Sequence, residues 1–116
     1  MTRGRQALGR YGEAQAARWY TERGYEVVDR NWRVPDGEID LVARRGPMLV
    51  FCEVKTRAGD RFGTAAESVT PAKQRRLRRL ASIYLRATPL SPRPDVVRFD
   101  VACVTGREVE VIEQAF

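Results

Sequence analysis

Two acidic residues and a lysine carry the clearest chemical signal in this chain. Asp40 is followed, after twelve residues, by Glu53-Val54-Lys55. Carboxylate oxygens are the ligands that Mg²⁺ and Mn²⁺ prefer, and a cation held between two carboxylates can polarise a phosphodiester oxygen and lower the pKa of water. Lys55 follows Glu53 by two residues on the same face of the strand, where it could stabilise the charge of a phosphoryl transition state. The pattern predicts chemistry on a phosphodiester, assisted by Mg²⁺ or Mn²⁺.

The composition excludes several other chemistries. The chain has no histidine and only two cysteines, so Ser-His-Asp catalysis, Cys-His catalysis and a structural zinc site are excluded. Neither common glycine-rich phosphate-binding loop occurs. Cys52 and Cys103 lie in apolar runs and are interpreted as buried residues of a protein in a reducing, cytoplasmic compartment. A disulfide between them is an alternative that nothing else in the sequence favours.

The sequence predicts one domain, residues 1–116, around a single core. Residues Met1–Leu8 are expected to form a loose basic arm. Hydrophobic patterns and turn residues predict helices Gly9–Arg23 and Pro71–Ala87, and strands Tyr25–Arg33, Glu38–Arg44, Met48–Thr56, Val96–Thr105 and Glu108–Glu113. Arg57–Val69 and Thr88–Pro94 are expected to be loops, with Thr70 capping the second helix. The predicted order is αβββαββ, an α/β fold.

Strand alternation determines whether the two acids can meet. It places Glu38, Asp40 and Val42 on one face of their strand and Ile39, Leu41 and Ala43 on the other. If Arg44 pairs with Leu49, Asp40 lies opposite Glu53, whereas a slip by one residue would separate them. The alternative is that both acids are exposed polar residues on a half-solvated sheet. Against it, Met48–Cys52 is apolar on both faces, which is typical of a buried strand, so an acid and an amine at its end favour a site.

Two helical residues are candidates for the same site, because each shares a stripe with residues suited to the core. The stripes are Glu13, Ala16, Ala17 and Tyr20 on the first helix and Gln74, Leu77, Ala81 and Leu85 on the second. Glu13 has an alternative explanation, a favourable interaction with the positive N-terminal end of its helix. Asp36 is assigned to a Val34–Gly37 turn, and Asp100 is considered a structural residue.

Several motifs together resemble a known group of proteins. They are Gly12-Glu13-Ala14, Asn31-Trp32-Arg33, Gly37-Glu38-Ile39-Asp40, Glu53-Val54-Lys55-Thr56-Arg57, Phe62-Gly63, Lys73-Gln74-Arg75-Arg76 and Arg98-Phe99-Asp100-Val101. The acids and lysine resemble the signature of the PD-(D/E)xK nuclease superfamily. The whole set, which covers nearly the entire chain, resembles the bacterial YraN family, which is similar in pattern to archaeal Holliday-junction resolvases.

The resemblance implies a restriction-endonuclease-like fold, a mixed β-sheet flanked by helices. It also implies that Asp40, Glu53 and the Val54 carbonyl hold the metal and that Lys55 is catalytic. Glu13 would correspond to a helical acid that reaches the same metal centre. Gln74 would point toward the site, as a helix glutamine does in some superfamily nucleases. Resemblance to the resolvases is compatible with a homodimer and favours DNA over RNA.

Charge points to a nucleic-acid partner. The net charge is +6, and a cationic surplus attracts polyanions. The candidate phosphate contacts are Arg57, Arg61, Lys73, Arg75, Arg76, Arg78 and Arg79. The alternative is that the helix arginines form a solvated face, but Glu67 is the one acid near them in the sequence. No basic stretch carries a broad apolar face, so membrane binding is not expected.

These observations leave three functional hypotheses. The first is a metal-dependent endonuclease that hydrolyses phosphodiester bonds in branched or structured DNA. The second is a non-catalytic nucleic-acid-binding module that retains the nuclease fold, but such a module has no need of Asp40, Glu53 and Lys55 together. The third is a protein-interaction subunit, which predicts a large exposed apolar patch that the sequence does not locate.

Overall fold

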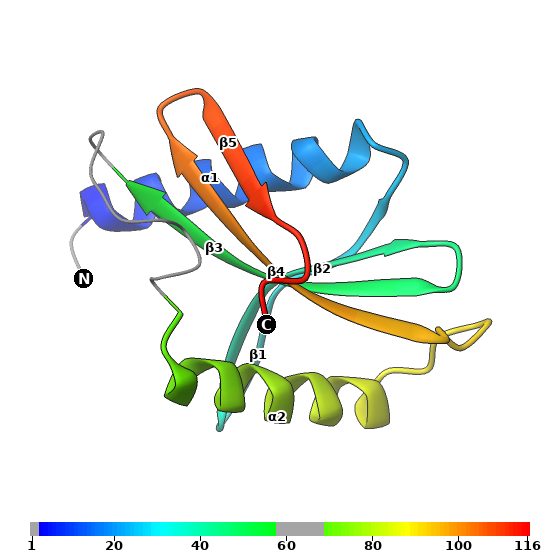
Figure 1. Cartoon of the computed structure of the whole chain (residues 1–116). Coiled ribbons are helices and arrows are strands. Elements are labelled where there is room, and N and C mark those ends of the chain that lie inside the picture. The colour runs from blue at the N-terminus through cyan, green and yellow to red at the C-terminus, as the bar shows by residue number, and fades with distance from the viewer. Residues whose placement is uncertain (1–2, 58–68) are drawn as a thin grey trace.

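In the computed structural model, two helices cover opposite faces of one five-stranded sheet (Figure 1). The backbone is described for residues 3–57 and 69–116, and side chains are described from residue 9 onward within those ranges. The elements are α1 (Arg3–Thr21), β1 (Glu26–Val34), β2 (Gly37–Arg45), β3 (Met48–Arg57), α2 (Pro71–Ala87), β4 (Val96–Thr105) and β5 (Glu108–Ile112). The predicted order αβββαββ is confirmed.

The N-terminal arm is the main difference in element boundaries. Helix α1 begins at Arg3, so residues 3–8 are helical instead of forming the expected arm. The physical reason is that Arg, Gln, Ala and Leu in this segment favour a helix, which can continue through Gly9 at a cost of about 1 kcal/mol. Within the described ranges, neither helix combines the length and the apolar composition needed to span a membrane.

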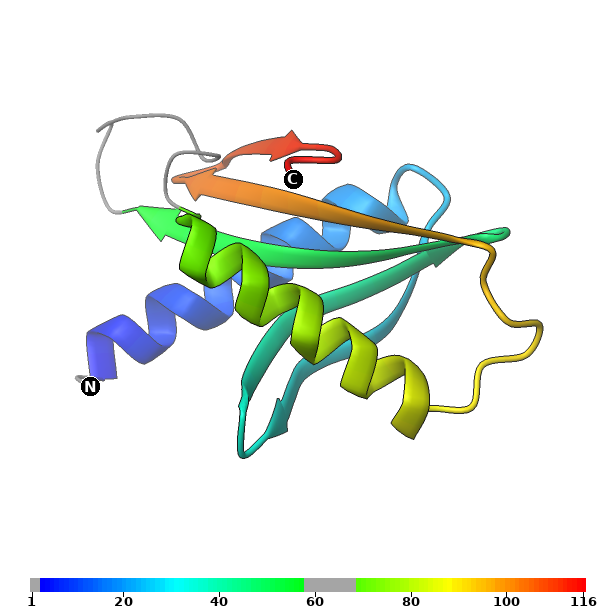
Figure 2. The same ribbon diagram turned by 60° about the horizontal axis from the view of Figure 1, so that its bottom comes forward.

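The sheet is mixed, with strand order β1-β2-β3-β4-β5. Neighbouring strands are antiparallel except for β3 and β4, which are parallel. A parallel pair needs a crossover connection, and α2 lies in the one that links these two strands. Figure 2 shows α2 crossing in front of the sheet and α1 behind it. This arrangement confirms the predicted mixed sheet flanked by helices.

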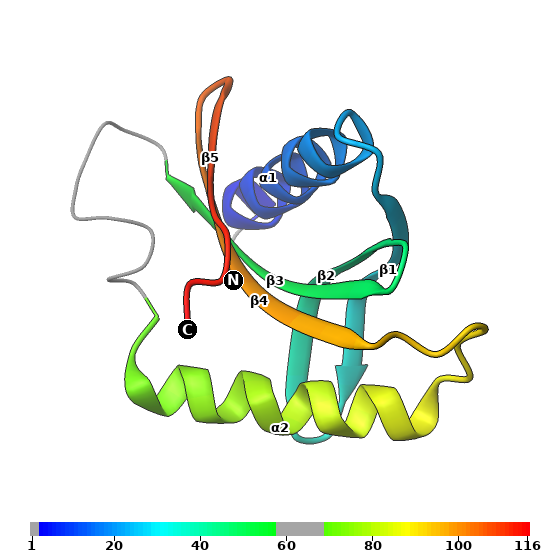
Figure 3. The ribbon, with the colours of Figure 1, turned by 45° about the vertical axis from the view of Figure 1, so that its right-hand side comes forward.

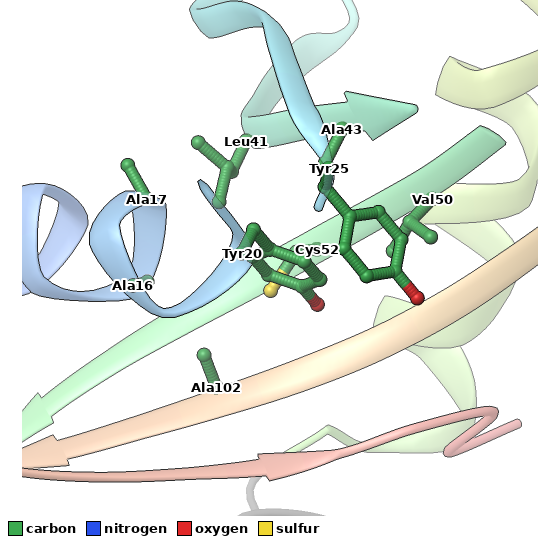
Figure 4. Close-up of a cluster of buried hydrophobic side chains, with 9 residues drawn as sticks. All are labelled: Ala16, Ala17, Tyr20, Tyr25, Leu41, Ala43, Val50, Cys52 and Ala102. Atoms are coloured by element: carbon green, nitrogen blue, oxygen red, sulfur yellow. The ribbon is translucent and has the colours of Figure 1, made fainter. Parts of the chain in front are cut away.

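The two faces of the sheet have separate cores. Figure 4 shows the core under α1, formed by Ala16, Ala17, Tyr20, Tyr25, Leu41, Ala43, Val50, Cys52 and Ala102. The core under α2 contains Ile39, Val42, Leu49, Phe51, Leu80, Ala81, Tyr84 and Phe99. Strand β3 alternates between them, since Leu49 and Phe51 face α2 while Val50 and Cys52 face α1. This explains why β3 is apolar on both faces until Glu53.

The sheet divides at the level of the two acids. The β2–β3 ladder begins at Arg45 and Met48 and ends at Leu41 and Cys52. Beyond this point β2 remains paired with β1, and β3 remains paired with β4 to its last residue, Arg57. Figure 3 shows the β1–β2 hairpin turning toward α2 while β3 and β4 continue in another direction. We call this point of separation, where Asp40 and Glu53 lie, the fork.

Local backbone geometry accompanies the fork. Asn31 of β1 has a φ of 51°, a left-handed conformation that asparagine tolerates better than most residues. It lies between the residues paired with Leu41 and Ile39, so it is level with Asp40. The expected alternation fails here, because Leu41 packs under α1 whereas Ile39 packs under α2. The prediction that these two residues share a face is therefore wrong, since β2 bends at Asp40.

Helix α2 is placed by its cap and by a close contact. The Thr70 side chain accepts a hydrogen bond from the Lys73 N–H at 3.3 Å, which confirms the predicted N-cap. Gly37 at the start of β2 has a φ of 151°, and a Cβ there would lie 3.2 Å from Leu80 Cδ1. Glycine at this turn thus lets the β1–β2 hairpin approach α2 closely.

Candidate active site

The two acids of the sequence pattern meet at the fork. Arg44 pairs with Leu49, which is the register predicted from strand alternation and brings Asp40 level with Glu53. The Asp40 side chain accepts a hydrogen bond from the Val54 N–H at 2.9 Å and also bonds with the Glu53 side chain. Both acids and the backbone of Val54 therefore belong to one site.

The electrostatics of Asp40 are unusual for a carboxylate. Burial raises the pKa of Asp40 to about 9, and the hydrogen bond and charge of Glu53 act in the same direction. The Val54 N–H opposes the shift, and the charge of Glu13 adds to it. Like charges held together in a partly buried place favour either a retained proton or a bound cation. The site is thus suited to exchanging a proton for a metal ion.

Helix α1 brings a further acid to the same place. One carboxylate oxygen from each of Glu13, Glu38 and Asp40 lies within 4.8 Å of the other two. Burial raises the pKa of Glu13, the Asn31 side chain opposes this by hydrogen bonding, and the charge of Glu38 adds to the rise. Because α1 begins at Arg3, Glu13 lies in the middle of the helix. The alternative explanation, an acid at the helix N-terminus, is therefore wrong.

A glycine sets the distance between α1 and the sheet. Gly12 is buried, and a Cβ at this position would overlap the side chain of Thr56 on β3. The absence of a side chain lets the helix approach the strand end beyond the fork. The next residue, Glu13, is thereby placed beside the acids of the sheet.

Two residues of the site were not predicted from the sequence. Glu38 joins the carboxylate cluster and also forms an ion pair with Arg33, with 2.8 Å between Oε2 and Nε. The sequence did indicate Glu38, because strand alternation places it on the same face of β2 as Asp40. Asn31 adjoins Glu13. The sequence contained an indication of it, because asparagine is depleted in β-strands and Asn31 lies within a predicted strand.

Two lysines lie beside the acids. Lys55 Nζ is 3.6 Å from Glu53 Oε2, and both side chains are mostly buried. Lys73, in the first turn of α2, adjoins Lys55, and hydrogen bonding and repulsion from that ammonium lower the pKa of Lys73. Cations from a strand and from a helix therefore meet next to Glu53.

A pocket of about 290 Å³ opens between the fork and α2. Its lining residues are Gly37, Glu38, Asp40, Glu53, Lys73, Arg76, Leu77 and Leu80. The strands contribute the three acids, whereas α2 contributes Lys73, Arg76 and two leucines. The pocket thus has an acidic wall and a basic wall that face one another.

The Val54 backbone is directed at the same place. In an extended strand, the N–H and C=O of one residue point to the same neighbouring strand. The Val54 N–H donates to Asp40, so the Val54 carbonyl points into the fork as well. This orientation is the one that a carbonyl metal ligand would need.

Gln74 is not among the pocket-lining residues. Its Nε2 donates to the Val69 carbonyl at 3.2 Å, and this bond ties the start of α2 to the preceding segment. The physical reason is the rotation of α2, which buries Leu77, Leu80, Ala81 and Tyr84. This rotation directs Lys73 toward the pocket and Gln74 away from it.

The predicted phosphate contacts have different surroundings. Arg75 is exposed and Arg76 lines the pocket. Arg79 pairs with Asp36 at 3.4 Å, an acid that the sequence analysis did not place near the helix arginines. The Arg78 guanidinium lies 5.0 Å from the Phe99 ring centre and 5.4 Å from that of Phe116. The helix arginines therefore do not form one uniform face.

The two remaining candidate cations, Arg57 and Arg61, follow Glu53 in the sequence. Arg57 ends β3 and is partly buried, and Arg61 and Glu67 lie outside the described residues.

The fold and the site define an α/β protein with a nuclease-like architecture, in which acids and lysines meet at a divided sheet. Residues 12–104 match the family model described as "Uncharacterised protein family UPF0102", and the chain belongs to this family. It is the YraN family indicated by the sequence motifs.

Relatives in the same family match most of the chain. A UPF0102 protein of Frankia alni is 52% identical over 103 residues, which cover 89% of this chain and 84% of the relative. A UPF0102 protein of Kineococcus radiotolerans is 54% identical over 106 residues, covering 91% and 86%. A UPF0102 protein of Symbiobacterium thermophilum is 54% identical over 94 residues, covering 81% and 78%.

Proposed function

We propose that this protein is a metal-dependent endonuclease that hydrolyses phosphodiester bonds, in DNA in preference to RNA and in branched or structured substrates. The observation that carries the proposal is the convergence at the fork. Glu13 of α1, Asp40 of β2 and Glu53 of β3 meet there with Lys55 beside them. The free cysteines Cys52 and Cys103 fit a cytoplasmic enzyme.

The donor set fits Mg²⁺ or Mn²⁺. Carboxylates and a backbone carbonyl are hard oxygen ligands, which these ions prefer. Glu13, Asp40, Glu53 and the Val54 carbonyl would hold the ion, and Glu38 is close enough to contribute. The raised pKa values of Asp40 and Glu13 reflect burial and repulsion that a divalent cation would relieve.

The bound metal would supply Lewis-acid polarisation of a phosphodiester oxygen and a lowered pKa for water. The side chains of the protein do the positioning. The Val54 N–H fixes the orientation of the Asp40 carboxylate. Lys55, whose ammonium is placed by Glu53, donates hydrogen bonds to phosphoryl oxygens as negative charge develops on them. The basic wall of the pocket offsets the repulsion between the phosphate and the acids.

The substrate backbone would approach along α2. Arg75 is exposed and Arg76 lines the pocket, so phosphates next to the one being cleaved could contact this helix edge. The net charge of +6 favours encounter with a polyanion. A homodimer, which would present two sites to a branched substrate, belongs to the proposal and can be checked by light scattering.

A cleavage panel tests the proposal. It contains a four-way junction, flaps, duplexes and single strands of DNA and RNA, each with Mg²⁺ or Mn²⁺. We expect metal-dependent cleavage that Asp40→Asn abolishes and that the control Glu26→Gln, at an exposed acid of β1, preserves. Binding without cleavage on the whole panel would contradict the nuclease and favour the alternative, a non-catalytic nucleic-acid-binding module.

A further inference from the structure

The only two lysines of the chain are neighbours in space. The sequence has 21 cationic residues, of which Lys55 and Lys73 are lysine and the other 19 are arginine. The two lysines come from β3 and α2, and they lie close enough that the charge of Lys55 lowers the pKa of Lys73. Placing two like charges together is unfavourable, and the charge of Glu53 offsets only part of the repulsion, since the pKa of Lys73 remains lowered. A further anion at the pair would relieve the rest.

The position of the pair suggests which anion that is. Lys55 Nζ lies 3.6 Å from Glu53 Oε2, and Lys73 lines the pocket together with Glu53 and Asp40. A cation site on the acids would therefore border an anion site on the lysines. A phosphodiester suits both sites. One of its non-bridging oxygens could bind the metal ion, while the other, which shares the negative charge, contacts the lysines.

We propose that Lys73 acts with Lys55 to hold the non-bridging oxygens of the phosphate that is to be cleaved, which makes Lys73 a second substrate-contacting cation of the active site. The inference rests on the proposed nuclease function and names a residue that the sequence analysis treated only as a general phosphate contact. Both ammonium groups donate hydrogen bonds to the phosphate oxygens.

Lysine suits this role better than arginine would. An ammonium is a compact point charge that can turn its three donors toward different oxygens, whereas a guanidinium is a rigid planar fork. Lys73 lines the pocket of about 290 Å³ together with Glu53 and Arg76, and Lys55 lies beside Glu53 at its border. The side-chain stem of Arg76 lies beside Gly37, at the hairpin.

The small number of lysines allows a direct spectroscopic test. The protein is labelled with ¹³C at lysine, so that two side-chain signals are observed and assigned with Lys55→Arg and Lys73→Arg. A short DNA duplex is added in Ca²⁺, which replaces Mg²⁺ to limit hydrolysis. We expect both signals to shift together as the duplex binds. A Lys73 signal that does not move, whether or not that of Lys55 does, would overturn the inference.

Kinetics separates contact with the reacting phosphate from general attraction. We expect Lys73→Ala to lower kcat by about 10², the order found when one transition-state stabiliser is removed, with little change in KM. Lys73→Arg should recover part of this loss because it keeps the charge. The control Arg75→Ala, an exposed neighbour that does not line the pocket, should change only KM and the salt dependence.

The outcomes of the two experiments are distinct. If Lys73→Ala, shown to be folded by its circular dichroism and melting temperature, behaves like Arg75→Ala, the inference is wrong although the protein is a nuclease. If the parent cleaves no substrate, the proposed function fails, and the lysine signals still decide whether Lys73 contacts phosphate.

Discussion

Two aspartates in this protein, the buried Asp100 and the half-buried Asp40, have opposite surroundings. Asp100 on β4 is fully buried and accepts hydrogen bonds from Tyr20 Oη at 2.5 Å, from Arg98 Nε and Nη2 at 2.8 and 2.9 Å, and from the Gln114 N–H at 3.0 Å. Asp40 on β2 receives one backbone hydrogen bond within the described residues and otherwise faces acids. The Asp100 carboxylate is neutralised by its neighbours, whereas that of Asp40 is not.

The difference separates a structural acid, Asp100, from the acid that we propose as a metal ligand, Asp40. Arg98 supplies the opposite charge for Asp100 and also donates to Tyr25 Oη at 3.0 Å, so the network joins β4 to the α1 core. A buried charge with this many donors has no need of a ligand. Asp40 and Glu53 instead repel each other, which costs stability unless a proton or a cation is bound. Repulsion between carboxylates therefore distinguishes the candidate site, whereas the buried carboxylate of the core has an opposite charge and hydrogen-bond donors around it.

The largest expected effect concerns Asp100. We expect Asp100→Asn to lower the free energy of unfolding by about 3–5 kcal/mol, because the buried charge of Arg98 keeps only the half-exposed Glu113 as an acidic partner. Asp40→Asn should leave the stability of the metal-free protein unchanged or raise it, since it removes a carboxyl group whose ionised form is disfavoured by burial and by Glu53. Urea unfolding of both variants in a chelator measures the contrast, and a similar loss in both would remove the distinction between the two acids.

A smaller effect is expected for the glycine that places Glu13. We expect Gly12→Ala to lower the free energy of unfolding by about 1–3 kcal/mol, because the new Cβ overlaps Thr56 and must push α1 away from β3. Metal affinity should fall as well, since Glu13 would move. Gly9→Ala is the matched control: its Cβ meets nothing within 4 Å, so it should stabilise α1 by up to about 1 kcal/mol. Equal melting temperatures for the two variants would contradict the account.

Counted per pH unit, the smallest effect is a dependence of stability on pH. Folding raises the pKa of Asp40 from an ordinary value of 3.8 to about 9. Between these values the folded state binds the proton more tightly than the unfolded chain, so the metal-free protein should lose stability as pH rises. The slope is limited to about 1.4 kcal/mol per pH unit for one proton. Chemical unfolding at about pH 5 and pH 8 should show a steeper loss for the parent than for Asp40→Asn, and equal losses would contradict the pKa shift.

The sequence was sufficient to predict that Asp40 and Glu53 lie together. A short turn after Arg45 fixes the hairpin, and once Arg44 is opposite Leu49, strand alternation brings the acids together. The element order followed from turn residues and from the Thr70 cap with Pro71 after it. These features depend on local chemistry, which a sequence displays directly.

Features that depend on tertiary packing were not predictable in this way. The run Leu80-Ala81-Ser82-Ile83-Tyr84-Leu85 offers apolar residues over a wide arc, so several rotations of α2 satisfy the pattern. The rotation that places Leu80 and Tyr84 on the sheet brings Lys73 into the site and turns Gln74 away. Likewise, the change of face at Ile39 follows from the bend of the hairpin at the fork, and alternation alone has no information on that bend.

Metal titration tests the central claim most directly. Mn²⁺ is titrated by calorimetry into the metal-free parent, Asp40→Asn, Glu53→Gln and the control Glu26→Gln. The account predicts that the parent and the control bind Mn²⁺ alike and that each of the other two variants loses more than about tenfold in affinity, or 1.4 kcal/mol. Unchanged Mn²⁺ binding in both Asp40→Asn and Glu53→Gln would contradict the assignment of a metal site at the fork.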